Sequence, residues 1–316
     1  MARRKHTVEI EKVKVEKVTT KGDQLILDAA RASFDRQAHE YSDEANIKLL
    51  QYLAYADPNH WEPYAHVRVA FTLPHWVIIH KKLNANHKAG MVELIPEDNP
   101  DDRFVGHSLW GWFRLLQDHC IHFNAVNSII DKLTGAAPFA ALVLKLKSLR
   151  PNGTRHNQIR VELAPSGIPE LDFVSLRVQC PIVIMRQLEK HQVGFVASEA
   201  SGRYILYKKI YEPTTLHHKP ENKKQGAGAE LGFVRNLIAR GIIKVSHAVS
   251  LASYTVLHRV LGVAIEEARY TMPMATATTR VITASRADWA RVDNLRKGGD
   301  AQSDIRLLNG LIQNAL

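Results

Sequence analysis

Three segments in which apolar and polar residues alternate constrain the fold of this chain more than any other feature. They cover residues 6–17, 67–73 and 171–180. Alternation puts successive side chains on opposite faces of an extended chain, so each segment predicts a half-buried β-strand. Helices are predicted where apolar residues recur at three- and four-residue spacing or where a capping residue opens the segment, at residues 23–34, 43–55, 106–119, 125–149, 231–270 and 300–316.

The charge of the chain indicates what kind of ligand it attracts. The 316 residues carry a net charge of +10, and the pI is about 9.5. A positive field favours anionic ligands. The basic residues form no long tract, and neither a zinc finger nor the basic and aromatic motif of an RNA-binding sheet is present, so direct nucleic-acid binding is not expected. Small phosphorylated substrates fit the charge, and a solvated basic surface is the alternative.

Several other classes of protein are not expected from this sequence. No apolar run approaches the roughly 18 residues of a membrane span, and the basic amino terminus lacks the apolar core of a signal peptide, so a cytoplasmic protein without membrane contact is expected. Two cysteines, Cys120 and Cys180, are too few for a four-cysteine zinc site, and a disulfide is not expected in a reducing compartment. The spacing of His75, His80 and His87 fits no single helical face, so no metal site is predicted.

The most informative segment for function lies at residues 186–204. It ends in a run that contains Glu199, Ser201, Gly202 and Arg203. A hydroxyl, an unobstructed backbone N–H and a forked guanidinium are the groups that bind a phosphate. This short motif is weak when it stands alone, because a surface turn has the same composition.

Other motifs occur around this segment in a recognisable order. They lie at residues 30–34 (ARASF), 60–66 (HWEPYAH), 262–273 (GVAIEEARYTMP), 294–296 (NLR) and 301–306 (AQSDIR). The ordered set resembles the flavin-dependent thymidylate synthases, and the resemblance covers roughly residues 6–73 and 171–316. Several motifs in one order are far more specific than any single motif.

The resemblance implies the fold, the reaction and the assembly of the protein. It implies an α/β (α+β) fold of the flavin-dependent thymidylate synthase type, with a mixed sheet flanked by helices, in a homotetramer whose active sites are shared between subunits. The implied reaction transfers a one-carbon unit from methylenetetrahydrofolate to C5 of dUMP with the help of FAD. A pyrimidine deoxynucleotide monophosphate and a folate are therefore the expected partners.

The residues expected at the substrate are carried over from the same motifs. Arg296 matches the arginine that faces the uracil ring, where a guanidinium stabilises negative charge, and His191 is the second catalytic candidate. The predicted nucleotide ligands match the family position by position and comprise Gln187, Glu199, Ser201, Gly202, Arg203 and Arg269.

The residues expected at the flavin depart from the family pattern. The candidates are Ser33, His60, Lys190, His191, Gln192, Ser285 and Arg291. The family sequence R-H-R reads Lys190-His191-Gln192 here, and Gln192 removes a charge-assisted contact. Asp300 stands where a histidine is common and would repel a diphosphate. The accumulation of such changes predicts that FAD binding is weakened or lost.

Residues 75–170 interrupt the resemblance. We predict an inserted helical subdomain here, with residues 1–74 and 171–316 forming the catalytic domain. Residues 74–81 resemble 181–187, and residues 106–116 faintly resemble 283–296, so a decayed partial duplication is the alternative to an unrelated insertion.

Three functions remain open from the sequence. The first is FAD-assisted synthesis of dTMP. The second is hydroxymethylation of dUMP or dCMP, by a flavin-weak or flavin-free hydroxymethyltransferase that makes precursors of modified DNA. The third is a non-catalytic, nucleotide-binding paralogue.

Overall fold

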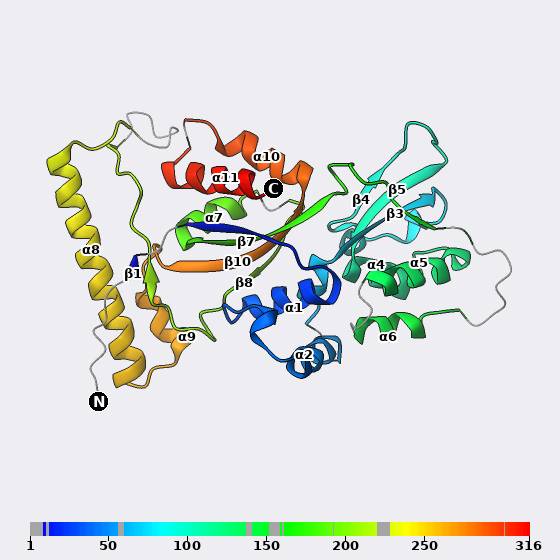
Figure 1. Cartoon of the computed structure of the whole chain (residues 1–316), viewed down its shortest axis with the longest axis horizontal. Helices are drawn as coiled ribbons and strands as arrows, with labels where there is room; N and C mark the ends of the chain where they lie inside the picture. The colour runs from blue at the N-terminus through cyan, green and yellow to red at the C-terminus, as the bar shows by residue number, and fades with distance from the viewer. Residues whose placement is uncertain are drawn as a thin grey trace.

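The computed structural model describes most of the chain, in an elongated arrangement of two sheets and their helices (Figure 1). The residues it describes are all except 1–8, 11–12, 56–59, 137–140, 152–158, 160, 192, 220–227 and 300. Gln192 and Asp300, two of the positions at which the flavin motifs depart from the family, therefore lie outside the described residues.

One four-stranded antiparallel sheet lies in the middle of the molecule. Its strands, in spatial order, are β2 (Lys14–Val18), β7 (Phe173–Pro181), β10 (Ala277–Ser285) and β8 (Val196–Glu199). The helices nearest to this sheet are α1 (Gly22–Ala32), α7 (Ile182–Glu189), α10 (Arg286–Arg296) and α11 (Ser303–Ala315).

A second four-stranded antiparallel sheet lies at the right of Figure 1. Its strands, in spatial order, are β4 (Val92–Leu94), β5 (Asp102–Ser108), β3 (Arg68–Pro74) and β6 (Glu162–Leu163). The helices on this side are α2 (Asp43–Tyr55), α3 (Ala85–Lys88), α4 (Leu109–Gln117), α5 (Phe123–Ala136) and α6 (Ala141–Ser148). A two-stranded parallel ladder joins β1 (Glu9–Ile10) to β9 (Lys209–Ile210).

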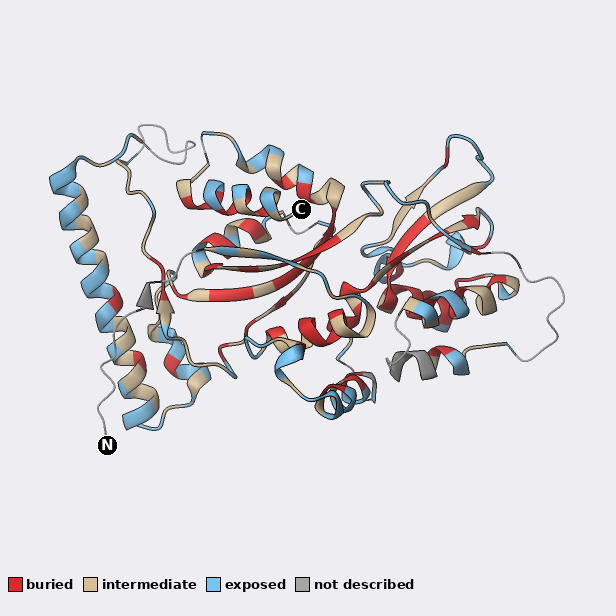
Figure 2. Cartoon of the chain, viewed as in Figure 1, coloured by how far each residue is buried: buried red, intermediate tan, exposed pale blue. Residues whose placement is uncertain are grey.

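Each sheet has its own buried core, as Figure 2 shows along β7 and β10 and again around β3, β5 and α4. The first cluster extends along the chain from Leu25 to Val161. The second cluster runs from Val174 to Ile312. The predicted boundary at residue 74 thus falls inside one core, because β3 pairs with β5 and β6 from the far side of it.

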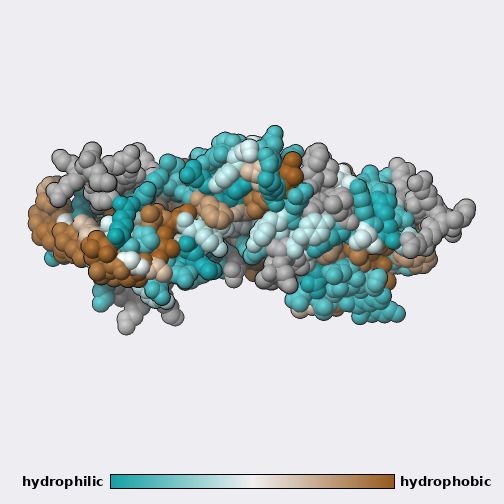
Figure 3. Space-filling view, turned by 90° about the horizontal axis from the view of Figure 1, so that it is seen from below, coloured by the Kyte–Doolittle hydropathy of each residue, from teal (hydrophilic) through white to brown (hydrophobic). Residues whose placement is uncertain are grey.

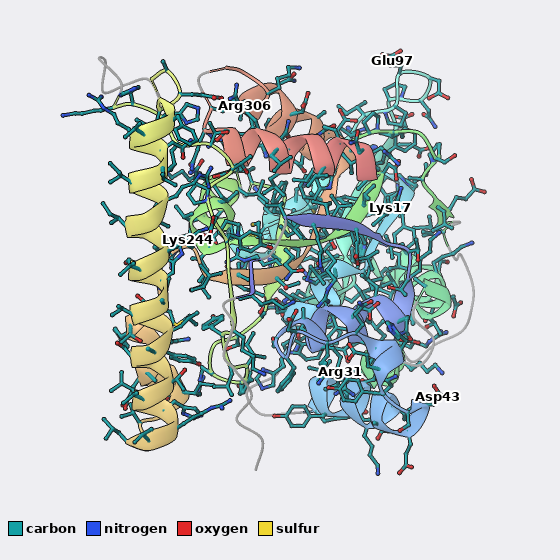
Figure 4. All side chains as sticks on the ribbon, turned by 60° about the vertical axis from the view of Figure 1, so that its left-hand side comes forward. Lys17, Arg31, Asp43, Glu97, Lys244 and Arg306 are labelled. Carbon is teal, nitrogen blue, oxygen red and sulfur yellow. The ribbon has the colours of Figure 1, made fainter. Side chains whose placement is uncertain are left out.

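A long helix, α8 (Phe233–Thr255), stands at the left edge of the molecule in Figure 1. In Figure 4, Lys244 points from this helix toward the rest of the chain, where its ammonium group lies 3.5 Å from Glu212. The face turned away from Lys244 carries exposed apolar side chains, among them Ile238, Ile242 and Val245, and a brown strip lies along this edge at the left of Figure 3.

The predicted α/β class is confirmed, and several predicted elements form, including the strands at 67–73 and 171–180 and the helices at 23–34 and 43–55. Three details differ. The expected mixed sheet is instead two antiparallel sheets, with parallel pairing in the described residues confined to β1 and β9. Residues 75–170 contain strands β4, β5 and β6 as well as helices. The helix predicted over 231–270 is interrupted at Gly262, which takes a φ of +69°.

Candidate functional site

The predicted phosphate-binding turn directly follows β8. The Ser201 N–H donates to the carbonyl oxygen of Ser33 at 2.9 Å, which ties the turn to the end of α1. Gly202 is buried, and a Cβ at this position would come within 2.8 Å of the ring of Tyr207. The turn therefore needs glycine here, and it leaves the Arg203 side chain 61% exposed.

Glu266 and Glu199 each form an ion pair with an arginine beside this turn. Arg203 Nε lies 3.0 Å from a carboxylate oxygen of Glu266, just ahead of Arg269 in the chain. Glu199 accepts a hydrogen bond of 2.6 Å from the Thr278 hydroxyl and forms an ion pair with Arg280. Thus Glu199 is occupied by the neighbouring strand β10, whereas the guanidinium of Arg203 is exposed at the surface.

Arg269 lies on the same side of the molecule as this turn. It begins the 3₁₀ turn η5 (Arg269–Thr271) that follows α9 (Ile265–Ala268) and is exposed. Burial raises the pKa of Tyr207 and of Tyr254, and the positive charge of Arg269 opposes both shifts. The guanidinium therefore lies near the two tyrosines and close to the Gly202 turn.

A second group of predicted residues precedes β8 in the chain. Arg296 Nε donates to His191 Nε2 over 2.8 Å. Burial lowers the pKa of His191, and Arg296, Arg291 and Lys190 lower it further, so the ring is neutral and accepts this bond. Gln187 lies on α7, where its amide donates to Gln302 at 2.5 Å.

The structure therefore divides the predicted substrate residues into two groups at opposite ends of β8. Ser201, Gly202, Arg203 and Arg269 gather after the strand, and His191 and Arg296 meet before it. Within the described part of the chain, no hydrogen bond or ion pair joins one group to the other.

The residues predicted to bind FAD are engaged in other contacts. The Ser285 hydroxyl caps α10 by accepting from the Asp288 N–H at 3.1 Å. Arg291 donates to the carbonyl oxygen of Val193 at 2.7 Å and pairs with Asp288. The exposed His60 stacks on Tyr52, with ring centroids 5.8 Å apart.

Among the described candidates, the side chains of the exposed Lys190 and the partly exposed Ser33 and the ring nitrogens of His60 have no hydrogen bond or ion pair with another described residue. A diphosphate needs several convergent donors. In the described part of the chain, the candidates do not present such a convergent set, so they do not fit the flavin in the way that the family motifs imply.

A buried network that sequence reasoning did not identify connects the two cores. His66, at 1% exposure, shares a 2.8 Å hydrogen bond with the Thr283 hydroxyl and a 3.0 Å bond with the Ser198 hydroxyl. Burial and the nearby Arg68 lower its pKa to about 3. The sequence signal was present, because His66 ends the HWEPYAH motif, but its partners lie far along the chain.

The described residues contain neither a candidate metal centre nor a membrane-spanning helix. No group of three or more histidine, cysteine or acidic side chains could hold a metal ion there. No helix in that part is long and apolar enough to cross a membrane.

Comparison with known proteins supplies one family. The family model described as "Thymidylate synthase complementing protein" matches residues 161–316. No curated protein matches the chain.

Two solved structures of a UMP/dUMP methylase, PolB from Streptomyces cacaoi, are also similar. The one bound with 5-Br UMP has a TM-score of 0.45 at 12% identity and covers 98% of this chain and 90% of that chain. The one bound with 5-Br dUMP has a TM-score of 0.42 at 14% identity and covers 98% and 92%.

Proposed function

We propose that this chain, whose residues 161–316 match the model of the thymidylate synthase complementing proteins, is a member of that family and transfers a one-carbon unit from methylenetetrahydrofolate to C5 of dUMP. The observation that carries the proposal is the pairing of Arg296 with His191, which presents a guanidinium beside a neutral imidazole. The family match and the uridine nucleotides named for the PolB structures support dUMP as the substrate.

The phosphate of the nucleotide is assigned to the turn after β8. The Ser201 hydroxyl, the backbone at Gly202 and the exposed guanidinium of Arg203 lie together there, with Arg269 close by. Arg203 would exchange its exposed ion pair with Glu266 for a phosphate, which accepts two parallel hydrogen bonds from a guanidinium. An exposed ion pair stabilises the protein little, so this exchange is favourable.

The base is assigned to Arg296. Carbon C5 of uracil becomes nucleophilic when negative charge on the ring is stabilised, and a cation at the ring carbonyl does this. His191 accepts from Nε of Arg296 and thereby orients the guanidinium, whose terminal nitrogens stay available for the base. His191 is thus a positioning residue for Arg296 in this proposal.

The residues assigned to the phosphate and the residue assigned to the base lie apart in one chain. We therefore assign a complete site to the interface between subunits. The exposed apolar face of α8, which includes Ile238, Ile242 and Val245, supports association with further subunits. The homotetramer implied by the family resemblance is the proposed assembly. A cytoplasmic location remains a prediction from the sequence.

A second product is favoured by the occupied flavin residues. Methylation at C5 requires two electrons from a reductant, and in the family the reduced form of FAD would supply the hydride. Hydroxymethylation needs no reductant, because dUMP, methylenetetrahydrofolate and water balance to hydroxymethyl-dUMP and tetrahydrofolate. The contacts of Arg291 and Ser285 within the protein therefore favour a hydroxymethyltransferase as the alternative.

Product analysis tests both candidates. Purified protein is incubated with methylenetetrahydrofolate and either dUMP or dCMP, with and without FAD and a reductant, and products are separated by mass. Conversion of dUMP supports the proposal, and the mass distinguishes a methyl from a hydroxymethyl product. Arg203→Ala should reduce turnover, whereas Arg306→Ala, an exposed arginine on α11, should not. A wild-type protein that binds dUMP but converts neither nucleotide would favour the non-catalytic paralogue.

A further inference from the structure

The two halves of the chain contain the same arrangement of three strands and one helix. In the first half, the spatial order is β4, β5, β3, and α4 follows β5 directly. In the second half, the order is β8, β10, β7, and α10 follows β10 directly. In both halves the outer strand is reached from the first strand through a helical segment, so the path of the chain is also the same.

The strand registers agree residue by residue. Arg68 pairs with Ser108 in one half, and Phe173 pairs with Ser285 in the other. In each half the serine is the last residue of the middle strand and the cap of the next helix.

The outer strands agree as well. Val92 pairs with Gly106, two residues before the first serine, and Val196 pairs with Thr283, two residues before the second.

The side chains at the start of the two helices repeat the same contacts. Ser108 accepts from the Gly111 N–H at 3.0 Å, and Ser285 accepts from the Asp288 N–H at 3.1 Å. Four residues after each serine comes a fully buried tryptophan.

Each tryptophan bonds to the first strand of its own half. Trp112 Nε1 donates to the Val69 carbonyl at 2.9 Å, and Trp289 Nε1 donates to the Val174 carbonyl at 3.3 Å. In both halves the acceptor is the second residue of its strand.

The turn before each outer strand also repeats. Gly90 has a φ of +72° and lies two residues before β4, and Gly194 has a φ of +81° and lies two residues before β8. Three residues before each glycine is a histidine, His87 or His191. Equal registers, caps, tryptophan contacts and turns are not expected from an unrelated insertion.

From this correspondence we infer that residues 68–117 and 173–296 are two copies of one unit, and we propose that a cavity in the first copy binds a small organic anion through its phosphate or carboxylate. The inference does not rest on the proposed function. The proposal starts from a difference at the beginning of the two helices, where Gly111 in the first copy corresponds to Asp288 in the second. Three residues later both copies have an arginine, Arg114 and Arg291.

In the second copy, the protein fills this position with its own carboxylate. Asp288 accepts from the Ser285 hydroxyl at 2.8 Å and lies 3.2 Å from Arg291 Nη2. Its carboxylate packs against the turn, since a Cβ on Gly194 would come within 2.2 Å of it. In the second copy, the Asp288 carboxylate therefore occupies the place beside Arg291 at the start of α10.

In the first copy, the corresponding side chain is missing and a cavity of about 500 Å³ is present. This volume is within the usual range for small-molecule sites. Gly90, Ser108, Gly111 and Trp110 line it from the first copy, and residues 194–196 line it from the second. The cavity therefore lies where the two copies meet.

Three nitrogen atoms of the lining are buried and without a hydrogen-bond partner among the described residues. They are Arg68 Nε, Arg114 Nε and His107 Nδ1. A buried polar atom without a partner is costly, so each indicates a group that is supplied from outside the chain. Burial lowers the pKa of Arg68 to about 10, so this guanidinium stays charged at neutral pH.

His107 further specifies the ligand. Its Nε2 donates to the His87 carbonyl at 3.1 Å, so Nδ1 carries a lone pair. Burial lowers the pKa of His107 to about 4, and the ring is neutral. A ligand that satisfies all three atoms accepts from the two arginines and donates an N–H or O–H to His107.

The acidic groups nearby form no hydrogen bond with these three atoms. Asp118 holds the Nη2 end of Arg114 at 3.3 Å and also accepts from His87, while Asp288 interacts with Arg68 through its charge. With Arg291 paired to Asp288, three arginines face two carboxylates, and one positive charge remains for an anion.

A double substitution tests the proposal by copying the second half into the first. A Cβ at Gly111 would come within 2.1 Å of the His107 ring, and the residue that corresponds to His107 in the second copy is Ala284. His107→Ala with Gly111→Asp therefore provides both the carboxylate and the space for it. Titration calorimetry with inorganic phosphate and with 2-hydroxyglutarate, which both carry an O–H donor, measures binding, and thermal unfolding checks that each variant is folded.

Wild-type protein should bind at least one probe, and the double variant should bind it at least tenfold more weakly. Phosphate binding alone identifies a phosphate ligand, and 2-hydroxyglutarate binding alone identifies a carboxylate ligand. If the double variant does not fold, Arg114→Gln supplies the same test, because it removes the cation and leaves the cavity open. The proposal is overturned if folded wild-type protein binds neither probe at millimolar concentration, or if both variants bind like the wild type.

Discussion

Replacing His66 with glutamine is expected to make the folded protein less sensitive to acid. His66 is buried between the two cores, where it bonds to the hydroxyls of Thr283 and Ser198. Thr283 in turn shares a 2.6 Å bond with Ser175, and Ser198 donates to Glu62 at 3.4 Å. Protonating the ring would place an uncompensated charge in this network, beside Arg68.

The magnitude follows from the pKa of His66. Burial holds it at about 3 in the folded state, against 6.5 for the free side chain. The unfolded chain therefore binds the proton more readily, so the stabilisation is complete above pH 6.5 and is lost as the pH falls toward 3. Between about pH 7.5 and about pH 5, His66 alone should lower the free energy of unfolding by about 2 kcal/mol.

Urea unfolding followed by tryptophan fluorescence measures this change at a constant protein concentration. The free energy of unfolding of wild-type protein should fall by about 2 kcal/mol more than that of His66→Gln over this pH range. His60→Gln is the matched control, since His60 is exposed and its removal should leave the wild-type pH dependence unchanged. If wild type and His66→Gln lose stability in parallel, His66 is not buried as a neutral ring and the argument fails.

Four further predictions follow from the same structure. Arg203→Ala should weaken dUMP binding by about 2 kcal/mol in calorimetry, because the phosphate loses a charge-assisted partner, and unchanged affinity would remove Arg203 from the site. FAD should bind more weakly than micromolar in a fluorescence titration, because Arg291 and Ser285 are occupied within the protein, and submicromolar binding would contradict this. Val245→Asp on the apolar face of α8 should yield smaller assemblies in light scattering, and an unchanged mass would rule out this face as an interface. Deleting residues 75–170 should prevent folding, as judged by circular dichroism, because Phe71 of β3 packs on Trp112.

The local patterns of the sequence predicted much of the fold outside residues 75–170. Alternation identified β7, and helical spacing identified α1 and α2 within a few residues. The motifs around Ser201 and Arg296 identified side chains that the structure places in charged clusters. Such features depend on neighbours in the chain, so they can be predicted without knowledge of the tertiary structure.

Contacts between distant segments could not be predicted in this way. The strands β4 and β5 were missed because their apolar residues are few and are interrupted by Gly106 and by charged positions. The commitment of Arg291 to the Val193 carbonyl depends on the position of a turn that no motif specifies. The same holds for His66, whose partners come from two strands of the other sheet.

The two copies of the unit use one histidine position in opposite ways. In the first copy, His87 Nδ1 accepts from the Asn84 N–H at 3.2 Å, so Nε2 donates to Asp118 at 2.8 Å and lowers the pKa of that carboxyl. In the second copy, His191 Nε2 accepts from Arg296, so a neutral ring carries its proton on Nδ1.

Because the two rings carry their proton on different nitrogens, each histidine positions the arginine of a different proposed site. Through Asp118, His87 holds the outer end of Arg114 and leaves its Nε toward the anion cavity. His191 holds Nε of Arg296, and in the proposed function the terminal nitrogens bind the pyrimidine. Duplication followed by a change of one hydrogen-bond partner would account for the two proposed sites on one backbone, because the partner determines which nitrogen carries the proton.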